Sequence, residues 1–523
     1  MSVRSENLEK LEGGSFDVLI VGGGINGAVS AAALTDRGLR VAVIDRGDFA
    51  GFTSQESSNL VWGGFKYLEN YELPLVWKLC TSRNHLMRQY PTQISEVGFL
   101  ATLDKSSPFP PWLAALGSFA YWGIGRFFTD RPSYYRASAI ESVEPVVKTT
   151  SSRGGIEYMD AYLKDNDARF VWGFIRSALD GGAVAANYVS LAGSNLTPSG
   201  WEVTVLDELT NQNVDLKAAS IVNAAGPFVD GLNEKWDLKT DHRIVYSKGI
   251  HLVVPRVTDS ERVLAFFDDT KRLFYVIPMA HRSVIGTTDT RTEIADEGVT
   301  DEDRDFLLAQ INARLDLATP LTKADIIGER SGVRPLVVKT SGSDQKDTDW
   351  TKLSRKHEIE GDKKAKVVTI FGGKLTDCLN VGAEVAEALE QLGVTPGSAS
   401  EDWFGEPPQS VRDAFYAEAA KVGLDRKPSV ERATSMAEVL WRRHGRAGFE
   451  IVRAIEADPA SAQAALGDTD VLWAEISLMA EREMIATIDD FLRRRTKLSL
   501  IFNREELMAH PDMPRVKQLL KIS

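Results

Sequence analysis

A glycine-rich turn near the amino terminus constrains the fold more than any other feature of this sequence. Residues 16–21 (FDVLIV) form a continuous apolar run with the length of a buried parallel strand. The turn GGGINGA follows at once, and the small residues at 28–37 predict a helix that ends at Gly38. A second apolar run at 40–44 ends at Asp45. The pattern predicts the strand–helix–strand unit of a Rossmann-like α/β fold.

The three glycines of the turn have separate roles in holding a dinucleotide. Gly22 permits the tight turn, and Gly24 lets the backbone approach a pyrophosphate, whose charge the helix amino terminus stabilises. Gly27 lets the helix pack closely against the strand. Asp45 stands where it can accept hydrogen bonds from a ribose. Together these residues predict a dinucleotide site.

The glycine motif alone does not decide between FAD and NAD(P). A late apolar strand at 366–371 leads directly into Gly372-Gly373-Lys374-Leu375-Thr376. Flavoproteins with one large discontinuous cofactor domain need such a returning segment. The acidic side chain of Asp45 disfavours a 2′-phosphate, so FAD is the favoured cofactor on these observations.

Length and charge narrow the function further. A chain of 523 residues is expected to form two or three domains. Its formal net charge of −13 argues against broad nucleic-acid binding, which needs a basic surface, but allows a local cationic site for a small anion. Cys80 and Cys378 are expected to be reduced thiols. Neither they nor the seven histidines have a spacing that predicts a metal site.

The remaining pattern predicts how the chain is organised. Residues 1–14 lack the apolar core of a secretory signal and are expected to form a loose arm. A seam rich in Gly, Ser, Pro and acids at 397–408 separates the mixed pattern from a helical one. Apolar spacing at 470–495 predicts one long amphipathic helix. The uncharged segment 108–125 is interpreted as a buried or capping helix, a segment on a membrane surface, or, least favoured, a membrane span.

The chain resembles the FAD-dependent, quinone-linked (aerobic) glycerol-3-phosphate dehydrogenases and their relatives, the glycerophosphate oxidases. Each matching block is moderately specific, whereas their order over most of the chain is highly specific. The blocks are GGGINGA, SSNLVWGGFKYLENYE (57–72), DARFVW, VNAAGPFVD, SKGIHLVVP, RLFYVIP with IGTTDT, ERSGVRPL, SRKHEI, FGGKLTD and the carboxyl-terminal AEREMIATIDDFLRRRTKL.

This resemblance implies a glutathione-reductase/D-amino-acid-oxidase-like architecture. A discontinuous FAD domain is expected at about 15–105, 165–240 and 325–396, and an antiparallel-sheet substrate domain at about 106–164 and 241–324. These form one oxidoreductase region, 15–396, followed by an all-α cap domain at 409–523. The resemblance also implies oxidation of sn-glycerol 3-phosphate to dihydroxyacetone phosphate, a quinone acceptor, a cytoplasmic location on the inner face of the cell membrane, and a homodimer.

The family match also assigns residues to the site. His251, Arg334 and Lys374 are expected to be catalytic, and Lys66 and Arg355 are expected to bind substrate together with Arg334 and Lys374. A forked guanidinium suits a phosphate dianion, and a lysine at a strand end can stabilise charge on reduced flavin. Asp289 is equally compatible with a flavin contact and with a turn cap. The residues expected to bind FAD are Gly22, Gly24, Ile25, Asn26, Gly27, Asp45, Arg46, Thr53, Ser54, Ser58, Leu60, Gly63, Gly64, Val189, Ala225, Gly226, Gly373, Lys374, Leu375 and Thr376.

Three positions depart from the family pattern. Trp62 replaces a histidine, so a proton-accepting ring and a possible covalent flavin tether are lost. Lys66 replaces an arginine, and Asp377 introduces a negative charge. These changes leave open an oxidase that forms hydrogen peroxide, a dehydrogenase of another hydroxy acid or amine, and a non-enzymatic flavin protein.

Two segments are candidates for membrane contact. One is the aromatic stretch 112–128, and the other is the basic run Arg493-Arg494-Arg495 with Lys497. The alternative for the basic run is a solvated helix face.

Overall fold

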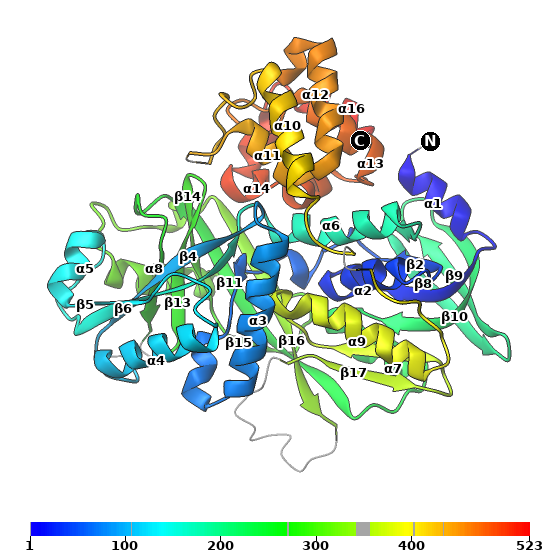
Figure 1. Ribbon diagram of the computed structural model, residues 1–523, viewed down its shortest axis with the longest axis horizontal. Helices are drawn as coiled ribbons and strands as arrows, with labels where there is room; N and C mark the ends of the chain where they lie inside the picture. Colours follow the sequence, from blue (N-terminus) through cyan, green and yellow to red (C-terminus); the bar gives the residue numbers. More distant parts are fainter. Residues whose placement is uncertain are drawn as a thin grey trace.

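A computed structural model of the protein describes residues 2–105, 107–268, 271–340, 356–400, 403–431 and 433–522. Figure 1 shows two sheets side by side and a separate group of carboxyl-terminal helices, coloured orange to red, at one end of the molecule. The amino-terminal and carboxyl-terminal helices both lie at this end. The mixed α/β class with a helical carboxyl-terminal region is therefore as predicted.

The first sheet contains the expected strand–helix–strand unit. Its order is β17-β18-β10-β1-β2-β7. In addition, β9 pairs in antiparallel fashion with the first half of β10, and β8 pairs in antiparallel fashion with β9. β10, β1, β2, β7 and β18 are parallel, so a strand from the end of the region returns beside the first strands. The strands are β1 (Ser15–Val21), β2 (Val41–Ile44), β7 (Val184–Ala186), β8 (Val189–Thr197), β9 (Gly200–Asp207), β10 (Gln212–Asn223), β17 (Glu358–Asp362) and β18 (Val367–Phe371).

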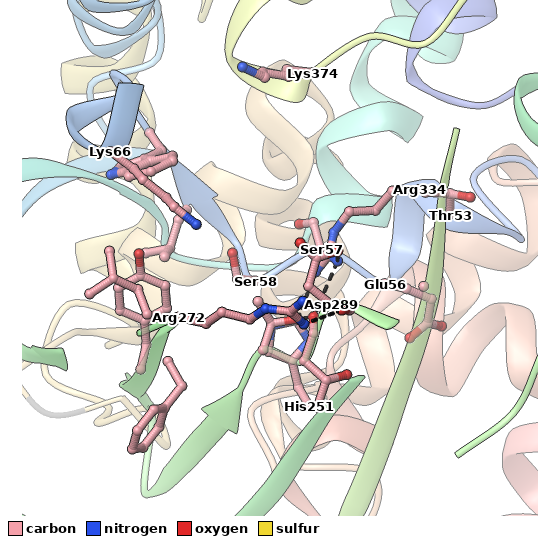
Figure 2. A pocket seen from close by; sticks show the side chains of 18 of the residues that line it. Thr53, Glu56, Ser57, Ser58, Lys66, His251, Arg272, Asp289, Arg334 and Lys374 are labelled. Atoms are coloured by element: carbon pink, nitrogen blue, oxygen red, sulfur yellow. Dashed lines mark hydrogen bonds and ion pairs between the residues drawn. The ribbon is translucent and has the colours of Figure 1, made fainter. Parts of the chain in front are cut away.

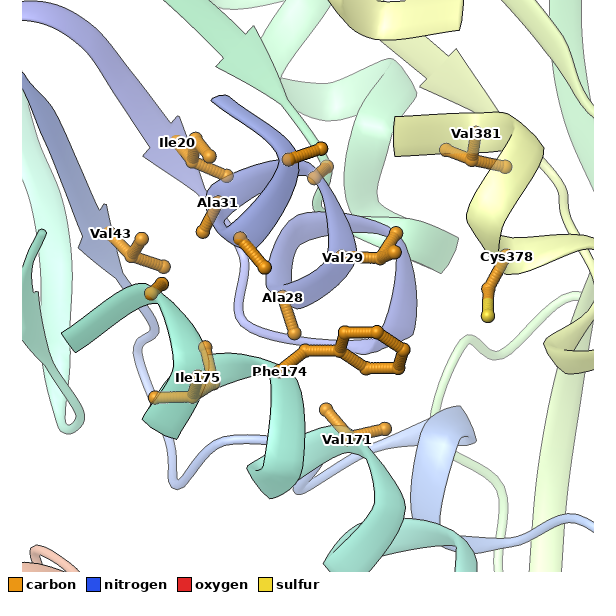
Figure 3. Packing of buried hydrophobic residues seen from close by; sticks show 14 of the residues in the cluster. Ile20, Ala28, Val29, Ala31, Val43, Val171, Phe174, Ile175, Cys378 and Val381 are labelled. Atoms are coloured by element: carbon orange, nitrogen blue, oxygen red, sulfur yellow. The ribbon is translucent and has the colours of Figure 1, made fainter. Parts of the chain in front are cut away.

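Three helices cover one face of this sheet (Figure 3). They are α2 (Ile25–Asp36), α6 (Asp167–Asp180) and α9 (Cys378–Gln391). The parallel strands β2, β7 and β18 are buried along their whole length, as expected for a sheet that is covered on both faces. Gly27 allows α2 to approach closely, since a Cβ there would lie 1.8 Å from the carbonyl oxygen of Gly22.

The expected loose arm at the amino terminus is instead a helix, α1 (Val3–Leu11), and that prediction is wrong. Asn7 is buried and donates to the carbonyl oxygen of Ala185 on β7. Arg4 forms an ion pair with Asp207, at the end of β9. These contacts hold the helix against the first sheet. The sequence of α1 has only a weak amphipathic pattern, so it does not predict this helix.

The second sheet is mostly antiparallel, as expected for the substrate domain. Its order is β15-β11-β14-β13-β12-β4-β6-β3, with β16 beside β11 and β5 beside β6. It recruits β3, β4 and β16 from segments that the sequence assigned to the FAD domain, so chain segments cross between the two sheets. The strands are β3 (Leu60–Val61), β4 (Ile94–Leu103), β5 (Ser133–Tyr135), β6 (Gly154–Leu163), β11 (His242–Pro255), β12 (Val263–Phe267), β13 (Leu273–Met279), β14 (Arg282–Gly286), β15 (Thr290–Thr292) and β16 (Gly328–Lys339).

Further helices, of three to 17 residues, connect and cover the two sheets. They are η1 (Thr53–Gln55), η2 (Phe65–Asn70), α3 (Leu73–Gln89), α4 (Pro111–Ile124), α5 (Ala137–Val143), α7 (Val229–Lys235) and α8 (Asp301–Arg314). The uncharged segment thus forms α4, and no helix among the described residues has the length and apolarity needed to cross a bilayer.

The carboxyl-terminal domain is helical, as expected. Its larger elements are α10 (Gln409–Lys421), α11 (Met436–His444), α12 (Gly448–Ala457), α13 (Trp473–Arg482), the π-helical turn η9 (Asp490–Arg495), α14 (Leu498–Ile501), α15 (Arg504–Ala509) and α16 (Met513–Leu520). The prediction of one long helix at 470–495 is wrong, because α13 ends at Arg482 and Met484 has a φ of +49°. Glu483 turns away at this break and binds Arg169 of α6.

The basic run is buried between domains, so its assignment to a membrane surface is wrong. Arg494 and Arg495 both bind Asp48, in the loop after β2. Lys497 is 1% exposed and is paired with Glu431. Acidic side chains from distant segments therefore neutralise these basic residues inside the protein, so they do not form the solvated helix face that was the alternative.

Candidate active site

The strand–helix turn forms the wall of a cavity of about 430 Å³. Gly22 adopts a φ of +109°, and a Cβ there would lie 2.5 Å from the carbonyl oxygen of Ala224. Gly24 precedes the first residue of α2 and carries no side chain that could cap the helix, so the helix amino terminus faces the cavity. This geometry suits a pyrophosphate, whose charge the unsatisfied N–H groups stabilise.

Asp45 closes β2 and borders the same cavity. Its carboxylate accepts hydrogen bonds from Gly23 N (2.6 Å) and Gly47 N (2.9 Å). Burial raises the pKa of Asp45 to about 6, and the two backbone donors oppose that rise. These bonds hold the carboxylate in place, and its remaining lone pairs can accept from a ribose.

A second cavity of about 600 Å³ adjoins the first. Ile25, Thr53, Ser54, Pro335 and Gly373 line both cavities, which together form one elongated site. We call the first the nucleotide chamber and the second the ring chamber.

Most residues expected to bind the cofactor border these chambers. Gly27, Gly63 and Gly64, although described, do not line either chamber. Gly27 packs α2 on β1, and Gly63 donates its N–H to Asp160 (2.9 Å). The expected residues in the nucleotide chamber are Gly22, Gly24, Ile25, Asn26, Asp45, Arg46, Thr53, Ser54, Val189, Ala225, Gly226 and Gly373. Those in the ring chamber include Ser58, Leu60, Lys374, Leu375 and Thr376.

Four cationic side chains border the ring chamber, Lys66, Arg272, Arg334 and Lys374. Figure 2 shows Arg272 and Arg334 reaching toward Asp289 from opposite directions, with Lys66 and Lys374 on other sides of the cavity. Arg334 lies on β16 and donates to Thr287 Oγ1 (2.7 Å). The chamber wall thus brings four cations together from both sheets, and the acidic side chains that also line it are Glu56, Glu72, Asp268, Asp289, Glu302 and Asp303.

Contacts around the chamber orient these cations. Lys374 Nζ lies 4.1 Å from the ring centroid of Tyr67. Arg272 Nη1 donates to the carbonyl oxygen of Asp289 (2.5 Å), and Arg334 Nη1 is 3.4 Å from Asp289 Oδ1. Asp289 therefore binds the arginines. The sequence alone is compatible with a flavin contact or a turn cap for Asp289, and the structure adds these contacts with the two arginines.

His251 lies on β11 and borders the ring chamber beside these cations. The ring is 2% exposed, and within the described part of the chain neither ring nitrogen has a hydrogen-bond partner. Burial lowers the pKa of His251 well below its ordinary value, and Arg330 and Arg334 lower it further. The imidazole is therefore neutral at neutral pH, and its unprotonated ring nitrogen can accept a hydrogen bond.

Asp377 is held away from the ring chamber. It accepts from Ser82 Oγ (2.9 Å) and pairs with Lys78 and His357, at 3.2 Å each. Burial alone would raise the pKa of Asp377, but hydrogen bonds from His357 and Asn380 lower it to about 2. Among the described lining residues Trp62 and Lys66 border the chamber and Asp377 does not, so the new negative charge is compensated outside the site.

Arg355 is predicted from the sequence to bind substrate. Arg355 lies outside the described residues. Arg272 is not among the residues that the sequence predicts for the site, although it comes immediately before the apolar strand β13. A lone arginine before a buried strand was the available signal, and only the second sheet brings it beside Arg334.

Comparisons with known proteins identify the family. Residues 17–348 match the family described as DAO, FAD dependent oxidoreductase, and residues 411–519 match the C-terminal domain of alpha-glycerophosphate oxidase. Aerobic glycerol-3-phosphate dehydrogenase from Staphylococcus aureus (strain MRSA252) is 30% identical over 399 residues, which cover 74% of this chain and 69% of that protein. This chain belongs to the FAD-dependent glycerol-3-phosphate dehydrogenase family.

Solved structures share the fold of this glycerol-3-phosphate dehydrogenase family member. Glycerol-3-phosphate dehydrogenase from Bacillus halodurans, complexed with FAD, superposes with a TM-score of 0.73 at 23% identity and covers 99% of this chain and 97% of its own. L-alpha-glycerophosphate oxidase from Mycoplasma pneumoniae, with FAD bound, gives a TM-score of 0.55 at 17% identity and covers 75% of this chain and 98% of its own. The family and fold expected from the motifs are confirmed.

FAD is the cofactor of this family member, and the two chambers fit it. The nucleotide chamber, with Asp45 and the amino terminus of α2, would hold the ADP half. Gly24 keeps that approach open, since a Cβ there would meet Ser54 Oγ at 3.0 Å. The ring chamber, between Trp62 and the segment Gly373–Thr376, would hold the flavin ring and leave room for a substrate.

Proposed function

We propose that this enzyme oxidises sn-glycerol 3-phosphate to dihydroxyacetone phosphate and passes the electrons to a membrane quinone. The observation that carries the proposal is the set of four cations around the ring chamber. Two arginine forks can bind a phosphate dianion through several oxygens at once. The name of the Staphylococcus aureus relative supports the same substrate.

His251 is the group that we propose takes the proton of the C2 hydroxyl. Its neutral, buried ring borders the chamber and has one unprotonated nitrogen whose lone pair can accept this proton. Bound FAD supplies a hydride acceptor at N5, so the alcohol loses a hydride and a proton and becomes a ketone. Arg272 and Arg334 hold the phosphate, and Lys374 stabilises negative charge that develops in the chamber.

A quinone is the proposed acceptor because a helix with an exposed apolar face packs against an element of the chamber wall. We call this the α4 face; its members are Trp112, Leu113, Leu116 and Phe119, with exposed fractions from 42% to 67%. α4 packs against η2, which carries Lys66 and Tyr67 of the ring chamber. Exposed Tyr71 and Leu73 flank Glu72, another residue of the chamber wall.

The α4 face also supports a location on the inner surface of the cell membrane. It lies away from the carboxyl-terminal helices (Figure 1). An apolar helix face with aromatic side chains can enter the headgroup region, where a quinone dissolved in the bilayer is within reach. Of the two segments that the sequence offers for membrane contact, the basic run is buried, so we propose that α4 makes the contact.

A stopped-flow experiment tests the reaction. Holoenzyme is mixed anaerobically with glycerol 3-phosphate while flavin absorbance is followed, with glycerol as the control that lacks phosphate. Bleaching by the phosphate ester alone is expected. Absence of bleaching at millimolar substrate would contradict the proposal. Reduced enzyme is then exposed to a soluble quinone or to oxygen, and faster reoxidation by oxygen with stoichiometric peroxide would identify an oxidase instead.

A further inference from the structure

The loop at residues 53–58 forms a wall common to both chambers. Thr53 and Ser54 border the nucleotide and ring chambers, whereas Glu56, Ser57 and Ser58 border the ring chamber. On the FAD-domain side, Ser54 Oγ accepts from Ile25 N (3.0 Å). The position of this loop therefore sets the space at the junction where the two halves of the cofactor meet.

The opposite side of the loop is held by the carboxyl-terminal domain. Arg493, on η9, donates through Nη2 to the carbonyl oxygen of Gln55. The same nitrogen lies 3.7 Å from Glu56 Oε1. Arg494, next along η9, donates to Gln55 Oε1 at 3.2 Å. Two consecutive residues of a separate domain thus contact both the backbone and the side chains of the loop (Figure 2 shows Glu56 at the cavity wall).

A third arginine holds the loop from the side of the second sheet. Arg330, on β16, donates through Nη2 to Gln55 O (2.9 Å) and to Asp167 Oδ2 (2.7 Å). Asp167 in turn accepts from Ser57 N (2.8 Å). The carbonyl oxygen of Gln55 consequently receives one guanidinium donor from each domain.

We propose that Arg493 is a positioning residue, through which the carboxyl-terminal domain fixes the loop 53–58 against the FAD cavity. Charge-assisted hydrogen bonds in a buried setting are strong and directional, so they hold a loop more firmly than its own turn contacts. Removing the guanidinium leaves the Glu56 carboxyl buried beside one cation fewer. The inference concerns FAD binding and does not depend on the substrate or the acceptor.

The charge of Glu56 supports this role for Arg493. Burial raises the pKa of Glu56 to about 7, and Arg493 and Arg330 oppose that rise. Glu56 Oε2 is buried and, among the residues that the structure describes, has no hydrogen-bond partner. Arg493 opposes the rise more than Arg330 or the backbone hydrogen bond from Ser331, so its guanidinium is the main group that stabilises the charged carboxylate.

The experiment compares Arg493 with another residue of the same domain junction. Arg493→Gln removes the charge, and Arg493→Lys retains a cation without the fork. Glu483→Gln is the junction control, because Glu483 binds Arg169 at 2.5 Å and is not a partner of the loop in any described contact. Arg504→Gln is the surface control, since its pair with Asp489 is about half exposed.

FAD affinity is measured by titrating each apoprotein with FAD and following fluorescence quenching, and the visible circular dichroism of bound flavin is recorded. Loss of a buried charge-assisted hydrogen bond predicts an increase in Kd of about tenfold to a hundredfold for Arg493→Gln. A changed dichroism spectrum is expected with it. Arg493→Lys should give a smaller increase, and both controls should remain close to the wild type even where Glu483→Gln lowers the unfolding temperature.

Two outcomes overturn the proposal. One is an unchanged Kd and dichroism spectrum in Arg493→Gln. The other is an equal loss of FAD affinity in Glu483→Gln, which would assign the effect to docking of the domain as a whole. If Arg493→Gln does not fold, Arg493→Lys is compared with Glu483→Gln, and equal affinities in that pair overturn the proposal in the same way.

Discussion

Asp48 and Arg495 form a fully buried ion pair that joins the nucleotide-binding sheet to the carboxyl-terminal domain. Arg495 Nη1 lies 2.8 Å from Asp48 Oδ2, and Nη2 donates to Oδ1 at the same distance. The guanidinium also lies over the ring of Trp172, 4.3 Å from its centroid. Such a bidentate pair between residues 447 positions apart couples the stability of the two domains.

Asp48→Ala should strongly destabilise the protein. The substitution leaves Arg494 and Arg495 as buried cations without their shared acid, which costs about 3–5 kcal/mol. Urea unfolding followed by tryptophan fluorescence checks this. Asp489→Ala, which removes only an exposed pair with Arg504, should cost less than about 1 kcal/mol. Equal effects of the two substitutions would contradict the role assigned to the buried pair.

Arg334→Ala and Arg272→Ala should each lower kcat/KM for glycerol 3-phosphate by about a hundredfold to a thousandfold, because a charged partner of the phosphate is lost. The affinity of the same variants for FAD, measured by flavin fluorescence quenching, should differ little from the wild type. Arg291→Ala, at a half-exposed arginine on β15, is the matched control. A parallel loss of FAD affinity would mean that the arginines act on the fold or the flavin, and not on the phosphate.

Glu56→Gln should stabilise the holoenzyme at high pH. A folded-state pKa raised to about 7 means that the wild type gains stability from this group below pH 4.5 and loses it as the pH rises through 7. Relative to the wild type, the variant should gain about 2 kcal/mol in unfolding free energy between pH 5.5 and 8 and then level off. Glu293→Gln, at an exposed site, controls for the lost charge. A pH-independent difference would exclude titration of Glu56.

Leu116→Glu on the α4 face should weaken membrane association, because a charge replaces an apolar side chain that is 61% exposed. Flotation with anionic liposomes is the measurement, at low and high salt. Leu196→Glu, on β8 in the other sheet, is the control for an added surface charge. Binding through an apolar face should persist at high salt. Loss of wild-type flotation at high salt would instead indicate an electrostatic contact.

The nucleotide chamber could be predicted from the sequence because its causes are local. The apolar run before Gly22 has the length of a strand. Only glycine fits at position 27, because a Cβ there would clash with the carbonyl oxygen of Gly22, five residues earlier. Asp45 follows the next strand directly. Such features depend on backbone conformation and on side-chain size over a few dozen residues, and a linear pattern records both.

Only the tertiary structure decided which charged residues are buried and which groups pair with them, where the partners are distant in sequence. Arg493, Arg494 and Arg495 read as an exposed basic run, yet their acids Glu56 and Asp48 come from loops more than 400 residues away. Arg272 joined Arg334 only because β13 and β16 belong to one sheet. The cost of burying a charge depends on which groups surround it in space, and the sequence order of this chain does not specify those neighbours.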